Sequence, residues 1–135
     1  MLDWENLETW RVVIIDDEPD NLDLVVETLS YYGVTVHASN DGESGIELVK
    51  QVEPNLILLD LSMPDVDGWE VHRRIRAMPS AVDVPIVAMT AHAMVGDRER
   101  VMAAGFDGYM TKPIRVPNLV KDIRAAIEES DQSET

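Results

Sequence analysis

Groups that can perform chemistry stand at the ends of four apolar segments of the sequence. They are Asp16 and Asp17, Asp60, Thr90, and Lys112. If the segments are parallel strands, their carboxyl ends meet at one edge of a sheet, where open α/β sheets bind ligands. Three carboxylates that converge repel one another unless a cation joins them. Oxygen ligands without His or Cys suit a hard ion, and Mg²⁺ is the usual choice because it keeps waters and shares phosphate oxygens.

A nucleophilic carboxylate, a metal ion, an ammonium group and a hydroxyl are what phosphoryl transfer to an aspartate requires. The metal and Lys112 would neutralise phosphoryl oxygens while Asp60 attacks in line. Each feature alone has an ordinary structural explanation, such as a solvated turn for the acidic pair. Their coincidence at the ends of four strands favours the chemical interpretation.

The segments that must position these groups alternate in type along the chain. Leu56–Leu59 is an unbroken apolar run, typical of a strand buried on both faces, and it ends at Asp60. Four further strands are predicted at 11–15, 34–38, 84–89 and 106–110. Helices are predicted after each strand, beginning near positions 19, 42, 68, 95 and 117. This alternation predicts an α/β fold with a doubly wound parallel sheet covered on both faces.

Three expectations concern packing. Residues 1–10 are expected to form a short extension that packs Trp4 or Trp10. The helix at 68–78 is expected to direct its arginines outward. The last helix is expected to start loosely, because Val116 is a poor N-cap, and to bury an apolar stripe. That stripe comprises Val116, Leu119, Val120, Ile123 and Ile127.

Composition limits the function classes. The chain has 135 residues, which predicts one domain, and 11 basic against 26 acidic residues give a formal charge of −15. Direct nucleic acid binding is therefore not expected. The absence of cysteine excludes disulfides, thiolate zinc sites and thiol nucleophiles. No signal peptide and no apolar run of about 18 residues is present, so a cytoplasmic protein without a membrane partner is expected.

The charge is unevenly distributed. Residues 12–49 contain nine acidic residues and no Lys or Arg, whereas most cations follow position 72. This asymmetry suggests two surfaces that attract different partners.

The chain resembles the receiver (phosphoacceptor) domain of two-component response regulators from about Trp10 to Glu129. The matching features are the Asp16-Asp17 pair, Asp60 in the segment LLDLSMPDVDG, Thr90 in MTA and Lys112 in TKP. The intervals between them fit as well. The resemblance implies a flavodoxin-like sheet with strand order 2-1-3-4-5 and five helices, and a single receiver domain over residues 1–135 with its core at 10–129.

The resemblance also implies a role for each site residue. Asp60 would accept the phosphoryl group from a phosphohistidine of a histidine kinase or histidine phosphotransfer protein. Asp17 would bind Mg²⁺ directly and Asp16 through water, with Asp60 and the Ser62 carbonyl as further ligands. Lys112 would contact the phosphoryl oxygens, and its bond to Pro113 would be cis.

Two positions would form a switch. Thr90 would move toward the phosphate and Tyr109 would turn inward behind it, which would remodel the face of helix four, strand five and helix five for a downstream protein target. Ser62 and His92 occupy positions that influence hydrolysis of the aspartyl phosphate in this family. His37 and His72 are expected to be ordinary surface or helix residues. The cations of the face suggest an acidic partner: Arg98, Arg100, Arg115 and Lys121.

Several alternatives remain at this stage. The resemblance leaves open two architectures, a stand-alone receiver and a receiver excised from a hybrid histidine kinase. It would be a self-phosphorylating and self-dephosphorylating phosphoacceptor rather than a conventional enzyme. A true aspartyl-phosphate hydrolase is disfavoured because Ser62, not an acid, stands two residues after Asp60. A phosphorylation-independent scaffold is disfavoured by the intact acceptor set, and a flavin-binding module by the missing phosphate loop after strand one.

Overall fold

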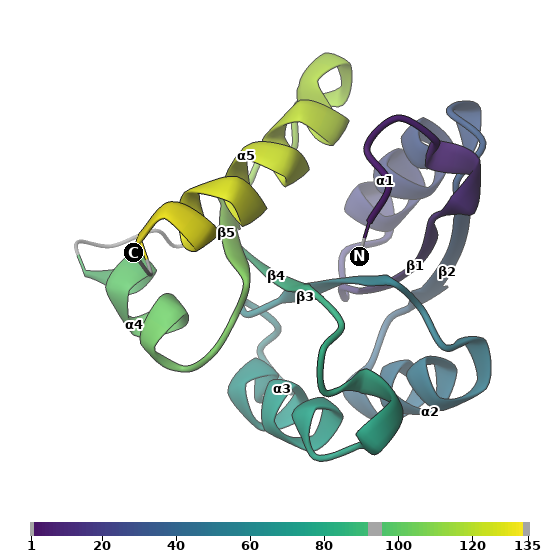
Figure 1. Cartoon of the computed structure of the whole chain (residues 1–135). Helices are drawn as coiled ribbons and strands as arrows, with labels where there is room; N and C mark the ends of the chain where they lie inside the picture. The colour runs from purple at the N-terminus through teal and green to yellow at the C-terminus, as the bar shows by residue number, and fades with distance from the viewer. Residues whose placement is uncertain (1, 92–95, 134–135) are drawn as a thin grey trace.

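The sheet has five parallel strands in the order β2-β1-β3-β4-β5 (Figure 1). In the computed structural model, residues 2–91 and 96–133 are described, with side chains described as far as residue 128. The strands are β1 (Arg11–Ile15), β2 (Thr35–Ser39), β3 (Leu56–Asp60), β4 (Ile86–Thr90) and β5 (Gly108–Thr111). The predicted α/β fold class and the strand order implied by the resemblance are both confirmed.

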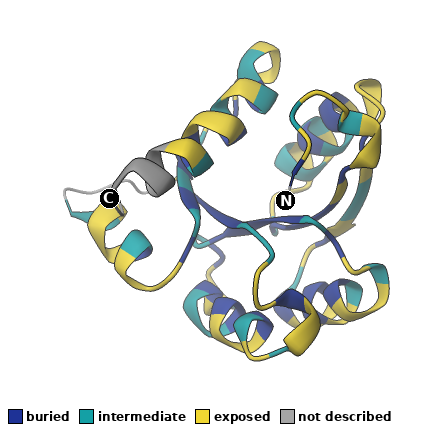
Figure 2. Ribbon diagram, viewed as in Figure 1, coloured by how far each residue is buried: buried dark blue, intermediate teal, exposed yellow. Residues whose placement is uncertain are grey.

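Helices cover both faces of this sheet (Figure 1). The helices are α1 (Pro19–Tyr31), α2 (Gly42–Val52), α3 (Gly68–Arg76), α4 (Asp97–Ala103) and α5 (Leu119–Ser133). Side chains alternate along each strand, so Val12 and Ile14 pack with α1 and α5, whereas Val13 and Ile15 pack with α2, α3 and α4. The central strands are buried on both faces, which explains their continuous apolar sequences (Figure 2).

A proline and two capping aspartates define where α1, α2 and α3 begin. Pro19 occupies the first turn of α1, where its missing N–H costs no hydrogen bond. The carboxylate of Asp41 accepts a hydrogen bond from the Ser44 backbone N–H at 2.7 Å and caps α2. The carboxylate of Asp67 does the same for α3 by accepting from the backbone N–H groups of Trp69 and Glu70. No helix in the described part of the chain has the length and apolar character needed to span a bilayer.

The N-terminal extension packs as expected. The Trp10 side chain is fully buried, and its indole N–H donates to the Asp3 carbonyl at 2.9 Å. Trp4 contacts Trp10 edge to face, with ring centroids 5.3 Å apart. Leu2 is also buried in the same core cluster. Residues 2–10 are therefore part of the packed domain.

Two packing expectations were wrong. Val116 is 39% exposed, because it lies in a 3-10 turn (Val116–Asn118) before α5 begins at Leu119. Arg76 does not point outward with the other arginines of α3. Its guanidinium donates to the Val84 carbonyl at 2.5 Å and forms an ion pair with Asp107. The last turn of α3 is therefore fastened to the segments that enter β4 and β5.

His72 is a helix residue, as expected, but it is buried rather than on the surface. Its ring stacks on Phe106, with centroids 4.0 Å apart, and its Nε2 has no hydrogen-bond partner among the described residues. Burial lowers the pKa of His72, and the neighbouring positive charge of Arg76 lowers it further. The folded protein therefore disfavours the charged imidazolium.

The stability of the protein should fall as the pH drops below about 6.5, the ordinary pKa of histidine. In that range the unfolded chain binds more protons than the folded one, because the folded-state pKa is lower. Chemical denaturation across this pH range should show a smaller slope in His72→Gln. The exchange His37→Gln on β2 is the matched control and should keep the wild-type slope. An unchanged slope in His72→Gln would contradict this account.

Candidate functional site

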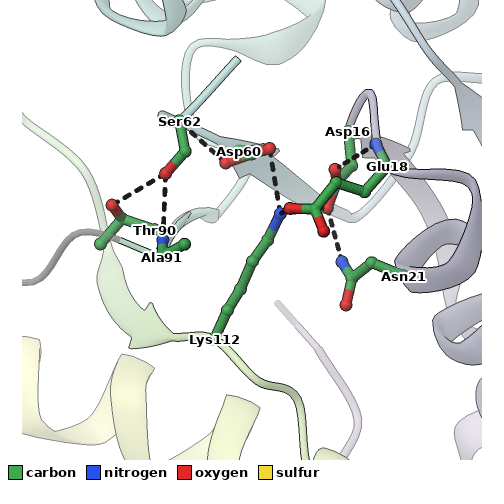
Figure 3. Close-up of polar contacts among 8 residues, drawn as sticks. All are labelled: Asp16, Glu18, Asn21, Asp60, Ser62, Thr90, Ala91 and Lys112. Carbon is green, nitrogen blue, oxygen red and sulfur yellow. Dashed lines mark hydrogen bonds and ion pairs between the residues drawn. The ribbon is translucent and has the colours of Figure 1, made fainter. Parts of the chain in front are cut away.

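Side chains from four strands meet at the carboxyl edge of the sheet (Figure 3). Asp60 is the last residue of β3 and Thr90 the last residue of β4, whereas Asp16 follows β1 and Lys112 follows β5. The parallel register brings these strand ends together although they are far apart in sequence. The structure thus assembles the residues that the sequence singled out, while their chemical roles remain predictions.

Lys112 lies at the centre of the cluster. Its Nζ is 2.9 Å from Asp16 Oδ2 and 3.1 Å from Asp60 Oδ2. A third contact, 2.7 Å long, joins it to Glu18 Oε1 (Figure 3). The Lys112 side chain is only 7% exposed and those of Asp16 and Asp60 are fully buried, so these three charges interact largely out of solvent, whereas Glu18 is 57% exposed. The peptide bond between Lys112 and Pro113 is cis, as the resemblance implies.

The two buried carboxylates are held by further hydrogen bonds. Asp60 Oδ1 accepts from the Ser62 backbone N–H at 2.7 Å. Asp16 Oδ1 accepts from the Glu18 backbone N–H at 2.9 Å, and its Oδ2 accepts from the Asn21 amide at 2.5 Å. Sequence reasoning missed Glu18 and Asn21 as members of the cluster. Glu18 extends the acidic run after β1, but only the fold shows that it reaches Lys112.

A hydroxyl pair lies beside Asp60. Ser62 Oγ and Thr90 Oγ1 are 3.0 Å apart, and Ser62 Oγ also accepts from the Ala91 backbone N–H at 3.0 Å (Figure 3). The side chain of Ser62 therefore connects the loop after β3 to the end of β4. His92 lies outside the described residues.

Tyr109 of β5 packs against the core on the α4 side of the sheet. Its phenolic oxygen is buried and has no hydrogen-bond partner in the described part of the chain. Burial raises the pKa of Tyr109, and the nearby carboxylate of Asp97 contributes in the same direction. The ring is thus directed inward in this structure, and its movement during signalling stays a prediction.

The electrostatics of the site favour an added cation. The cluster contains the carboxylates of Asp16, Asp17, Asp60 and Glu18 against the single ammonium of Lys112. Burial raises the pKa of Asp60, the Asp16 charge adds to this effect, and the Ser62 N–H and Lys112 oppose it. Burial also acts to lower the pKa of Lys112, but its contacts with Glu18, Asp16 and Asp60 outweigh that effect and raise it. The carboxylates are therefore incompletely neutralised.

The donor set fits a hard divalent ion. Carboxylate oxygens of Asp16, Asp17 and Asp60 all lie within 4.8 Å of one another. The ligands are oxygens only, which suits Mg²⁺, and the partial exposure of Asp17 leaves room for the waters that this ion keeps. In the part of the chain that the structure describes, these three residues form the group that could hold a metal.

Comparison with known proteins identifies the family. Residues 12–124 match the response regulator receiver domain. The chain belongs to this family. The recognition made from the sequence is therefore confirmed.

Relatives of different architecture share this domain. The chain is 32% identical to the polar-differentiation response regulator DivK of Brucella ovis over 117 residues, which cover 87% of this chain and 95% of DivK. It is 37% identical to the signal transduction histidine-protein kinase BarA of Escherichia coli over 108 residues, 80% of this chain but 12% of BarA. The chain spans about half the length of two further curated relatives, 51% and 48%.

The solved structures agree on the fold. The chemotaxis response regulator CheY4 of Vibrio cholerae superimposes with a TM-score of 0.79, covering 87% of this chain and 98% of CheY4. The sequence identity in that comparison is 23%, so it supports the fold alone.

Proposed function

We propose that this receiver domain accepts a phosphoryl group on Asp60 from a phosphohistidine of a histidine kinase or a histidine phosphotransfer protein. The observation that carries the proposal is the position of the buried Asp60 carboxylate, 3.1 Å from Lys112 Nζ and beside the carboxylates of Asp16 and Asp17. Phosphoryl transfer to a carboxylate depends on positioning and on neutralising negative charge, and these residues provide both.

In the transfer step an oxygen of Asp60 forms a bond to phosphorus while the phosphorus–nitrogen bond of phosphohistidine breaks. The electron pair of that bond returns to the imidazole nitrogen, so the donor protein is left with an unphosphorylated histidine. The Ser62 N–H fixes one oxygen of the Asp60 carboxylate. As the attacking oxygen of Asp60 loses its negative charge in the new bond, the ammonium group of Lys112 would shift from Asp60 toward the phosphoryl oxygens.

Mg²⁺ is the proposed cofactor. When bound, it would neutralise negative charge on the phosphoryl group and on the carboxylates. Asp16, Asp17 and Asp60, together with the Ser62 carbonyl, would hold it. Asn21 and the Glu18 N–H keep the Asp16 carboxylate in place.

The acceptor and the metal requirement can be tested by intact mass. After incubation with acetyl phosphate and Mg²⁺, the chain should gain one phosphoryl group that hydroxylamine removes, as expected for an acyl phosphate. The gain should disappear in Asp60→Asn and in a chelator, whereas Asp65→Asn, a change at an exposed acid in the loop before α3, should retain it. A stable gain at another residue, or an equal gain without metal, would contradict the proposal.

Thr90 and Tyr109 are the proposed switch. Thr90 Oγ1 now interacts with Ser62 Oγ, and a phosphoryl group on Asp60 would offer it a stronger, charged acceptor. Its displacement would change the space available to the Tyr109 ring. Because the Tyr109 oxygen has no partner in this packing, an alternative ring position costs no hydrogen bond.

Thr90→Ala should uncouple this response from phosphorylation. Beryllofluoride with Mg²⁺, a stand-in for the phosphoryl group, should shift the NMR signals of Tyr109 and of α4 in the wild type. In Thr90→Ala we expect the adduct to form but the shift at Tyr109 to fall by at least about half, because the contact between the Thr90 hydroxyl and the beryllofluoride is lost. Thr111→Ala, at the end of β5, is the control. A full response in Thr90→Ala would refute the assignment.

The surface built from α4, β5 and α5 is the proposed reader face for a downstream protein. Arg115 and Lys121 are exposed there. Arg98 and Arg100 of α4 are exposed as well, and Arg100 also lies over the Trp69 ring of α3, 5.5 Å from its centroid, and pairs with Asp97. An acidic partner surface would therefore meet cations on both the α4 side and the α5 side of this face.

We further propose a single receiver domain at residues 1–135 that works in the cytoplasm and binds no nucleic acid. The match covers 95% of DivK, so a regulator that consists almost entirely of this domain is the first candidate. A receiver tethered in a hybrid histidine kinase, the architecture suggested by the match to a short part of BarA, is the second candidate. The size of the protein detected in its native cells by an antibody against this domain separates the two.

A further inference from the structure

The open edge at β2 is the most accessible part of the sheet. β2 pairs with β1 on one side, and among the described elements no strand pairs with its other side. One of its five residues is buried, whereas every residue of β3 and β4 is buried. Figure 2 shows the contrast between the outer strand and the dark blue centre of the sheet. An exposed edge offers unpaired backbone groups to another chain.

The hydrogen-bond register identifies the backbone groups on the open side. The Thr35 N–H donates to the Trp10 carbonyl at 3.1 Å, and the Asp16 N–H donates to the Ser39 carbonyl at 3.0 Å. Alternate residues of a parallel strand bond to the same neighbour, so Thr35, His37 and Ser39 face β1. The N–H and C=O groups of Val36 and Ala38 consequently point away from the sheet.

The edge lacks the usual protection against pairing. Natural edge strands are commonly guarded by lysine, proline, an inward-pointing charge or a bulge. The segment 34–39 reads Val-Thr-Val-His-Ala-Ser and contains no Lys, Pro, Asp or Glu. Its pairing with β1 runs without a bulge from Thr35 to Ser39. The edge is therefore competent to accept a further strand.

A groove of about 590 Å³ runs beside this edge, between α1 and α2. Leu22 of α1, Ala38 of β2 and Leu48 of α2 supply its apolar surface, and Ser44, Glu47 and Gln51 form its polar side. A strand added to β2 would direct alternate side chains to either side of the sheet. An apolar side chain of that strand could enter the groove.

The charge around the groove selects the occupant. No Lys or Arg is among the described residues that line it, whereas Glu47 is. The whole segment 12–49, which contains α1, β2 and most of α2, has nine acidic residues and no Lys or Arg. A second copy of this chain, with a charge of −15, would be repelled, and a basic segment would be attracted.

We propose that the β2 edge binds an extended, lysine- or arginine-bearing segment of a protein partner, which adds to the sheet as a sixth strand. Backbone hydrogen bonds to Val36 and Ala38 would provide pairing, and the groove between Leu22 and Leu48 would take an apolar side chain. This site lies apart from Asp60 and does not depend on its phosphorylation.

The test uses a peptide of alternating lysine and valine, titrated into the isotopically labelled full chain. Amide signals of β2 and of the groove residues should shift. Ala38→Pro should abolish these shifts, because it removes an outward N–H, and proline is tolerated on edge strands whose N–H faces solvent. Ala38→Ser is the matched control and should bind like the wild type. The spectrum of Ala38→Pro outside β2 reports whether the variant is folded.

Charge variants test the chemistry of the occupant. Glu47→Lys should weaken peptide binding about fivefold, the size expected for a surface charge pair. Lys50→Glu, on the same helix but outside the groove lining, should not weaken it. Four results would overturn the proposal: no shifts at β2 at millimolar peptide, equal binding of a glutamate–valine peptide, retained binding in folded Ala38→Pro, or self-association of the chain through β2.

Discussion

Replacement of Lys112 by glutamine is expected to slow phosphorylation of Asp60 by about a hundredfold, the order of magnitude for losing one positioned electrostatic interaction with the transition state. In the structure Lys112 Nζ contacts Asp16, Glu18 and Asp60 and is almost fully buried. Its charge is therefore beside the acceptor before the donor arrives, so only a short movement of the ammonium group toward the phosphoryl oxygens is needed during transfer. Glutamine retains a hydrogen-bond donor but not the charge.

The measurement is the initial rate of mass gain with acetyl phosphate at saturating Mg²⁺. Lys121→Gln changes an exposed lysine of α5 and serves as the matched control, with a rate close to that of the wild type. Near-ultraviolet circular dichroism in Mg²⁺ must show that Lys112→Gln is folded, because the substitution leaves buried carboxylates without their partner. A Lys112→Gln rate within a factor of about three of the wild type would show that the charge is not used in transfer.

Asp60→Asn is expected to stabilise the metal-free protein by about 1 kcal/mol, a typical single-site effect. The raised pKa of Asp60 means that the folded state disfavours its negative charge, chiefly through burial and secondly through Asp16. Asparagine is nearly isosteric and its carbonyl can still accept from the Ser62 N–H. The substitution removes the charge repulsion and loses only the attraction to Lys112.

Addition of Mg²⁺ should make the wild type more stable than Asp60→Asn. A ligand that binds only the folded state stabilises it, so the wild type should gain stability as Mg²⁺ is added, whereas Asp60→Asn, with one ligand charge fewer, should gain less. Urea unfolding in chelator and in Mg²⁺ measures both effects, with Asp65→Asn as the exposed-acid control. A metal-free Asp60→Asn that is less stable than the wild type would show that the contact with Lys112 outweighs the repulsion.

Much of the site was predictable, because in a parallel α/β sheet the residues that follow the strands lie together at one edge. Once 11–15 and 56–60 are identified as buried parallel strands, Asp16 and Asp60 must lie at one edge, whatever the chain does between them. The residues at which the strands begin were predicted less well. The last strand was predicted from Phe106, but β5 begins at Gly108, because Phe106 packs in the loop against His72. End effects of this kind depend on packing between elements rather than on local pattern.

The sequence by itself determined the alternation of strands and helices, the family, and the set of residues at the carboxyl edge. These features follow from local hydrophobic periodicity and from the residue types at strand ends, both of which can be read directly from the sequence. Only the tertiary structure decided that Glu18 and Asn21 join the cluster, that Arg76 turns inward to Val84 and Asp107, and that His72 is buried. Each of these features depends on a contact between two elements. The free energy of such a contact depends on both segments, so the sequence of one segment alone does not specify it.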